Sequence, residues 1–418
     1  MQSKFRLPQE TWRLVFQQAV QTPEIWRADW DYHVDDRLWQ TWAREDADQE
    51  RRGSHWEKVA TRRCIVRVCR EWKELGSEFL YETIDLGQYI NGLHHQAAYR
   101  KLVQRFRTSE DNPSTRGYGW WTKRIDCPRE IFSRHLVESL FDLLNCCHNV
   151  VVLTFHVGSA APLATQQTRL WTVLQSRFRH SLRRVIHHFG ELRLSDPHLT
   201  GYPQLVPSIP LLALEVTFRD LPPIPSAMRC SLTSLTLRVS SIATQKVSFK
   251  EWQLPRLRHL AIQDLHSHRI QCLIPFVQQH AKTLVSFCFD GGGHELDASI
   301  IRAAGPQLLN LSLGSLQLVR LPSATPLDGI THPGILDLMG LDDGNIPCRV
   351  TAALKSHVFP DLQRVRLLQH ASPLFAHPRI REMVEVCGEN GISLADKNGL
   401  AVKLFAPSGD ALGGWIWR

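Results

Sequence analysis

The chain has 418 residues, of which 43% are hydrophobic and 22% are charged. This length exceeds that of most single domains and this composition is typical of a folded protein, so the sequence predicts several domains or one elongated repeat array. It contains no apolar run of about 18 residues and no apolar signal segment at the start. We therefore expect no membrane partner, no secretion, and a cytoplasmic or nuclear location.

The net charge of +8 is the difference between 49 basic and 41 acidic residues. This excess is small for the length, so charge alone does not favour nucleic acid as the partner. Ten cysteines occur without a Cys-x-x-Cys pair and without the Cys/His spacing of a zinc site. We expect buried free thiols in a reducing compartment, with no metal and no cofactor.

The N-terminal segment 7–16 reads LPQETWRLVF and predicts a short helix. Pro8 suits the first turn, where its missing N–H needs no partner. Apolar residues then recur at i, i+3, i+4 and i+7, at Trp12, Val15, Phe16 and Ala19. This spacing predicts one apolar stripe that needs a second element to cover it.

A second helix is predicted about sixty residues later, around the segment VCREWKEL at 68–75. Its apolar positions repeat the same spacing, at Ile65, Val68, Cys69 and Trp72. The two amphipathic segments are therefore expected to pack against each other.

A Leu-Pro helix followed by a Val-Cys-x-x-Trp helix resembles the F-box, in the form found in fungal F-box proteins. Residues 79–86 resemble the strand-like segment that follows this module. The resemblance implies that the module docks onto the Skp adaptor of a cullin-RING ubiquitin ligase. The residues that it implies for the shared core and the adaptor-facing surface are Leu7, Pro8, Glu10, Trp12, Val15, Phe16, Val68, Cys69, Trp72 and Leu75.

An insert at about residues 21–62 separates the two F-box-like helices. It combines many charges with five tryptophans, at Trp26, Trp30, Trp39, Trp42 and Trp56. These tryptophans could form a partner-binding surface, because aromatic anchors dominate interfaces. Packing of the insert onto the neighbouring helices is the interpretation we favour. The insert departs from the compact F-box pattern.

A basic helix is predicted at about residues 97–106. Arg100, Lys101 and Arg105 alternate there with aromatic residues, which is a pattern of RNA-binding surfaces. A solvated helix face beside the loop at 109–119 explains the same residues, and we favour that interpretation. RNA binding predicts retention that weakens steeply with salt.

The rest of the chain repeats a motif close to L-x-x-L-x-L. Its central residues are 21 to 32 positions apart, which is close to the period of roughly 20 to 29 residues in leucine-rich repeats. They are Leu153, Val185, Leu214, Leu235, Leu260, Phe287, Leu311, Leu336 and Val365, with a last strand at 392–394. Helical returns are predicted at 136–144 and 380–387, and the usual turn Asn or Cys is missing, so the repeats should be irregular.

The predicted fold class is therefore α/β. A helical F-box-like module occupies residues 1–86, a linker or first irregular unit occupies 87–130, and an irregular leucine-rich-repeat solenoid of parallel strands and helical returns occupies 131–418. Together the two resemblances cover most of the chain.

Strand residues that alternate with the apolar ones should face the open side of the solenoid, which is its usual binding surface. Their charges are mixed, which favours a protein substrate over a nucleic-acid backbone. The expected substrate-binding residues are Arg184, Glu215, Arg238, His259, Asp290, Asn310, Asp337, Arg364 and Arg366.

No nucleophile elbow, phosphate-binding loop or paired-carboxylate motif occurs in the sequence. We therefore expect no enzyme but the substrate-recognition subunit of a Skp-cullin-F-box (SCF) ubiquitin ligase. The alternative is a repeat scaffold outside any ligase, in which the F-box-like helices only cap the exposed end of the solenoid.

Overall fold

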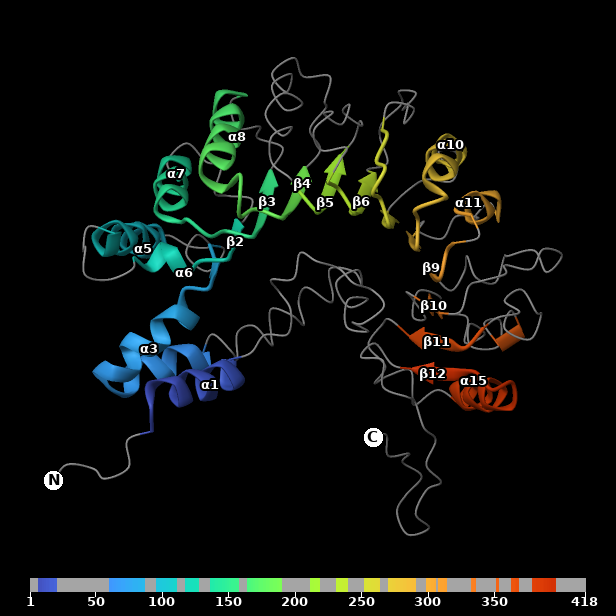
Figure 1. Ribbon diagram of the computed structural model, residues 1–418, viewed down its shortest axis with the longest axis horizontal. Helices are drawn as coiled ribbons and strands as arrows, with labels where there is room; N and C mark the ends of the chain where they lie inside the picture. Colours follow the sequence, from blue (N-terminus) through green and yellow to red (C-terminus); the bar gives the residue numbers. More distant parts are fainter. Residues whose placement is uncertain are drawn as a thin grey trace, which may run out of the picture. The chain divides into compact units, whose positions relative to one another are not determined.

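The computed structural model describes most of the predicted elements and divides them between two compact units. The last described residue of the first unit is Ser231, and the first described residue of the second unit is Leu232. The described residues are 7–20, 60–86, 95–110, 117–127, 136–157, 164–189, 211–218, 231–239, 252–263, 270–290, 298–305, 307–313, 332–335, 351–352, 362–367 and 378–395. Figure 1 shows their elements along the chain.

The first unit begins with three helical segments. They are α1 (Gln9–Val20), residues 60–68 and α3 (Arg70–Leu80). A small core of Phe16, Val20, Ile65 and Leu75 joins them, and partly buried aromatic side chains pack around it. These three segments are called the helical module below.

The apolar stripes of the helical module differ from those expected. On α1 the core side is Trp12, Phe16 and Val20, whereas Val15 and Ala19 are exposed. The predicted second helix is in fact two, because Cys69 has an extended backbone between residue 68 and α3. Sequence spacing assumed one uninterrupted helix there, and the break turns Val68 outward.

The first unit continues as parallel strands with helices between them. The strands pair in chain order: β1 (Thr83–Asp85), β2 (Arg124–Cys127), β3 (Val152–Val157), β4 (Arg184–Phe189) and β5 (Ala213–Phe218). The connecting helices are α5 (His95–Glu110), α6 (Tyr118–Trp121), α7 (Val137–Cys146) and α8 (Ala164–Phe178). Parallel neighbours require such crossovers, and α7 and α8 lie against one face of the strands (Figure 1).

The second unit has the same construction. Its parallel strands are β6 (Ser234–Val239), β7 (His259–Gln263), β8 (Ser286–Asp290), β9 (Asn310–Leu313), β10 (His332–Ile335), β11 (Arg364–Leu367) and β12 (Ser393–Ala395). Its described helices are α10 (Ile270–His280), α11 (Ala298–Ala303) and α15 (Pro378–Glu389). Central apolar residues of successive strands stand in register, as Leu260, Phe287 and Leu311 do.

The repeat strands lie where the spacing predicted them, with two differences. The strand of the degenerate copy is β10, which precedes the expected Leu336; residues 336–338 lie outside the described residues. The parallel sheet also begins at β1 and β2, before the predicted start at residue 131. The helix expected at 97–106 and the returns at 136–144 and 380–387 are confirmed as α5, α7 and α15.

The cysteines were all expected to be buried. Cys127, Cys146, Cys147, Cys288 and Cys387 are buried free thiols, but Cys64 and Cys69 are exposed, which corrects that expectation. Both lie on the helical module, whose small core cannot bury every apolar position. Among the described residues, no helix has the length and apolarity needed to cross a membrane.

Candidate functional site

Aromatic packing fixes the helical module. The rings of Trp12 and Trp72 have centroids 4.7 Å apart, and Phe16 meets Trp72 edge-on at 4.8 Å. An ion pair between Arg13 and Glu78, 3.4 Å apart, joins α1 to α3 at the surface. The tryptophan of the Val-Cys-x-x-Trp motif therefore holds the two helices together.

The cysteine of the same motif begins α3. Cys69 is the N-cap residue, and its Sγ accepts a hydrogen bond from the backbone N–H of Trp72 at 3.4 Å. A thiol thus occupies the position usually taken by Ser, Thr, Asp or Asn. This cap explains why the helix restarts here and why Trp72 is correctly placed against α1.

Arg62 joins the helix at 60–68 to the C-terminal end of α1. Its buried guanidinium donates from Nη2 to the carbonyl oxygen of Val20, 3.4 Å away, at the last residue of α1. A cation suits this position, because the helix dipole is negative at its C-terminus. Burial lowers the pKa of Arg62, while the nearby Glu82 carboxylate raises it.

Large apolar side chains are exposed mainly on the helical module. Leu7 is 47% exposed, Leu14 61%, Val15 45% and Val68 60%. Elsewhere in the described chain, Trp120 of α6 is the other large hydrophobic side chain of this kind. Single exposed apolar residues are ordinary, but their concentration on one small module is typical of an interaction surface. We call Leu7, Leu14, Val15 and Val68 the exposed apolar set.

The ten residues that the F-box resemblance implied fall into two groups. Phe16 and Leu75 are buried in the core, with Trp12 and Trp72 half-buried beside it. The exposed residues are Leu7, Pro8, Glu10, Val15, Val68 and Cys69. Sequence reasoning missed Leu14, although it is an apolar residue away from the core-facing side of α1.

The module is joined firmly to the first repeat strands. The hydroxyl of Thr122 donates to the carbonyl oxygen of Tyr81 at 3.0 Å, and the Lys123 ammonium lies 2.9 Å from the Glu82 carboxylate. Rings of Tyr81 and Tyr118 stack with centroids 4.4 Å apart. The exposed apolar set is therefore presented on a fixed base.

The structure describes the side chains of four of the nine expected substrate-binding residues. Arg184 and Arg364 are half-buried on β4 and β11. His259 and Asn310 are buried, so their expected exposure is wrong. Strand alternation determines the face on which a side chain lies, but it does not determine whether that face is covered.

The other five expected substrate-binding residues lie outside the side chains that the structure describes. Glu215, Arg238, Asp290 and Arg366 belong to described strands, but their side chains lie outside the described residues, as does all of Asp337. The tryptophans of the insert also lie outside them. No group of three His, Cys, Asp or Glu side chains suited to a metal occurs in the described part.

Comparisons with known proteins find distant likenesses among solved structures and none among family models or curated proteins. Among solved structures, the leucine-rich repeat-containing protein LegL7 from Legionella pneumophila is similar at 13% identity, over 73% of this chain and 90% of that chain, with a TM-score of 0.41. The strand order itself defines the class: parallel strands in chain order with helical returns form an irregular solenoid of leucine-rich-repeat type.

Proposed function

We propose that this chain is the substrate-recognition subunit of an SCF-type ubiquitin ligase. The helical module binds the Skp adaptor, and the repeats bind the protein to be ubiquitinated. The single observation that carries the proposal is the exposed apolar set on a module that also has the Leu-Pro and Val-Cys-x-x-Trp motifs.

The exposed apolar set favours this function over a simple cap. A helical cap buries its apolar residues against the terminal repeat. Here Leu7 and Val68 remain about half exposed or more, while polar contacts of Glu82, Lys123 and Thr122 join the module to the sheet. Apolar residues held open on a rigid base suit a protein partner better than an end cover.

The chain contributes proximity and performs no bond chemistry of its own. Binding both the adaptor and a substrate raises the effective concentration of substrate lysines near the conjugating enzyme. Such work belongs in the cytoplasm or nucleus and requires no cofactor and no metal.

A pull-down from cells tests the proposal. The tagged wild-type chain should retain the Skp adaptor and the cullin, and Leu7→Ala with Pro8→Ala should retain much less of both. Arg100→Ala is the matched control, because it changes an exposed residue of α5 outside the module. Equal adaptor recovery with the double variant and with wild type would contradict this surface assignment.

A further inference from the structure

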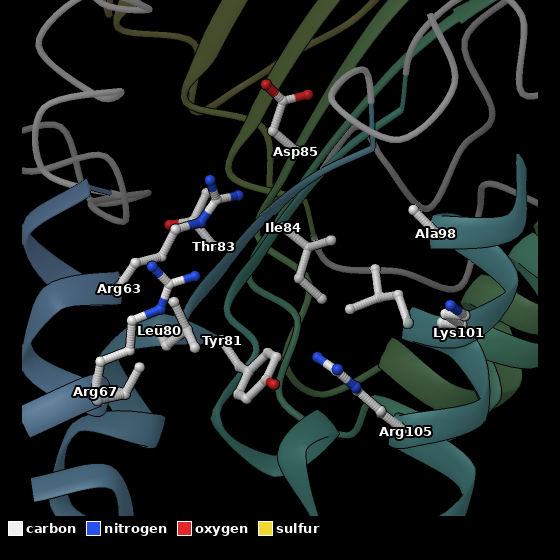
Figure 2. A pocket seen from close by; sticks show the side chains of 12 residues that line it. Arg63, Arg67, Leu80, Tyr81, Thr83, Ile84, Asp85, Ala98, Lys101 and Arg105 are labelled. Carbon is white, nitrogen blue, oxygen red and sulfur yellow. The ribbon is translucent and has the colours of Figure 1, made fainter. Parts of the chain in front are cut away.

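A basic pocket lies where the helical module meets the first repeat. Its volume is about 360 Å³, and its walls come from the helix at 60–68, from residues 80–85 and from α5. Figure 2 shows Arg67 and Arg105 extending from opposite helices toward the strand between them. The whole pocket lies within the first unit.

Four cations line this pocket: Arg63, Arg67, Lys101 and Arg105. Asp85 is the one carboxylate among the twelve lining residues. Arg67, Lys101 and Arg105 form no ion pair with any residue in the described ranges. Like charges facing one another across a pocket favour an anion between them.

Thr83 supplies a second, independent observation. Its side chain lines the pocket and is 7% exposed, yet its hydroxyl has no hydrogen-bond partner within the described part of the chain. Buried hydroxyl groups normally have a partner, because leaving one unpaired costs free energy. An anionic oxygen in the pocket would accept the hydrogen bond that Thr83 can donate.

The remaining walls are apolar or aromatic. On α5, Lys101 and Arg105 alternate along one helix face with Ala98 and Leu102, which have the spacing i, i+3, i+4 and i+7. Leu80, Tyr81 and Ile84 face them from the module side. The pocket therefore offers charge to one part of a ligand and apolar surface to another, at a size suited to a small molecule.

We propose that this pocket binds a small phosphorylated molecule, with its phosphate held by Arg63, Arg67, Lys101, Arg105 and the hydroxyl of Thr83. Arginine and phosphate oxygens form charge-assisted hydrogen bonds, which are stronger than neutral ones. The site is separate from the exposed apolar set and does not depend on adaptor binding.

Arg100 distinguishes this pocket from an RNA-binding helix face. It is exposed on α5, between residues that line the pocket and yet not among them. RNA tracking along the helix would use Arg100 together with Lys101 and Arg105. Of these three side chains, a phosphate in the pocket would use only Lys101 and Arg105, together with the other pocket residues.

Calorimetric titration of the full chain at low ionic strength tests the proposal, with phenyl phosphate and inorganic phosphate as probes. Both should bind at one site, phenyl phosphate more tightly because of the apolar wall. Arg105→Ala should weaken binding about tenfold or more, whereas Arg100→Ala, the matched control on the same helix, should leave the affinity unchanged.

Thr83→Val gives the sharper test, because the two side chains have nearly the same shape. Removing the orphan hydroxyl should leave the unliganded protein as stable as wild type, or more so, while phosphate affinity falls about fivefold. Asp85→Asn should strengthen binding by removing the one opposing charge.

Three results would overturn the site. The first is no saturable binding of either probe to the wild-type chain. The second is equal loss of affinity with Arg100→Ala and with Arg105→Ala. The third is RNA binding that needs Arg100 while neither probe binds. Thermal unfolding midpoints of Arg105→Ala, Arg100→Ala and Thr83→Val close to that of wild type would show that the variants remain folded.

Discussion

Cys69 shows how a single residue can determine the shape of the module. Read as one apolar position in a stripe, it predicted an uninterrupted helix. In the structure its thiol caps α3, and the extended backbone at this residue turns the preceding helix aside. The cysteine of the Val-Cys-x-x-Trp motif therefore acts through hydrogen bonding rather than through burial.

The capping role predicts that serine can replace Cys69 without loss of stability, whereas alanine cannot. Cys69→Ser should keep or slightly raise the free energy of unfolding, because a hydroxyl is a better N-cap acceptor than a thiol. Cys69→Ala should lower it by about 0.5 to 1 kcal/mol. Chemical unfolding followed by tryptophan fluorescence would measure both, and the reverse order of stability would contradict the cap.

His280 of α10 predicts a pH dependence in the second unit. Its Nε2 accepts a hydrogen bond from the backbone N–H of Leu254 at 2.9 Å, while Nδ1 lies 2.8 Å from the carbonyl oxygen of Phe276. The neutral ring with the proton on Nδ1 satisfies both contacts. Burial lowers the pKa of His280 below its usual 6.5, against the opposing effect of the Phe276 carbonyl.

Because the folded pKa is lowered, the unfolded chain takes up this proton first as pH falls below about 6.5. Stability should therefore fall between pH 7 and the lower folded pKa of His280. The His280→Gln variant should be less stable at pH 7 but should show a weaker loss on acidification. Urea midpoints at a series of pH values would measure this, and parallel pH profiles for the two proteins would contradict it.

At the residue scale, the sequence predicted which aromatic side chains pack between the helices of the module better than it predicted which apolar side chains are exposed. Phe16 is a core residue and Trp72 packs half-buried against the core, since large aromatic residues at helical spacing need burial. The exposure of Leu14 and Val15 was not predicted, because helical spacing alone does not say which of several adjacent apolar residues faces the partner helix.

At the scale of elements, Gly119 allows α6 to approach the end of α7. A Cβ at this position would overlap the carbonyl oxygen of Cys146, and this backbone cannot yield as a flexible side chain could. The backbone N–H of His148 also donates to the carbonyl oxygen of Gly119 at 3.4 Å. Only glycine fits this crossing.

Gly119→Ala should accordingly destabilise the first unit by about 1 to 3 kcal/mol through overpacking. Gly388→Ala is a suitable control, because a Cβ there meets nothing within 4 Å and alanine favours the helix. Thermal unfolding followed by circular dichroism would compare them. Equal melting temperatures for Gly119→Ala and wild type would show that the crossing can relax.

Most repeat strands were predictable because a short apolar motif recurs every 21 to 32 residues, which is a repeat-sized interval. β2 was missed, since Ile125 and Cys127 are only two apolar residues in a strand of four. The burial of His259 and Asn310 was also not predictable from the sequence, because alternation along a strand gives the face of a side chain and not the extent to which it is covered.

At the scale of the whole molecule, the chain carries two separate surfaces. The exposed apolar set lies on the helical module of the first unit, while parallel strands with alternating faces make up the repeats of both units. We therefore expect that substitutions in the exposed apolar set change adaptor binding and leave the repeats folded.

Size-exclusion chromatography of the full chain with purified Skp adaptor tests the central claim most directly. We predict that wild type and Gln104→Asp, a change at an exposed position of α5, co-elute with the adaptor. Val68→Asp should weaken the complex more than tenfold and elute separately, because a charge would be buried at the interface. Co-elution of Val68→Asp like wild type, or no complex with wild type, would contradict the account.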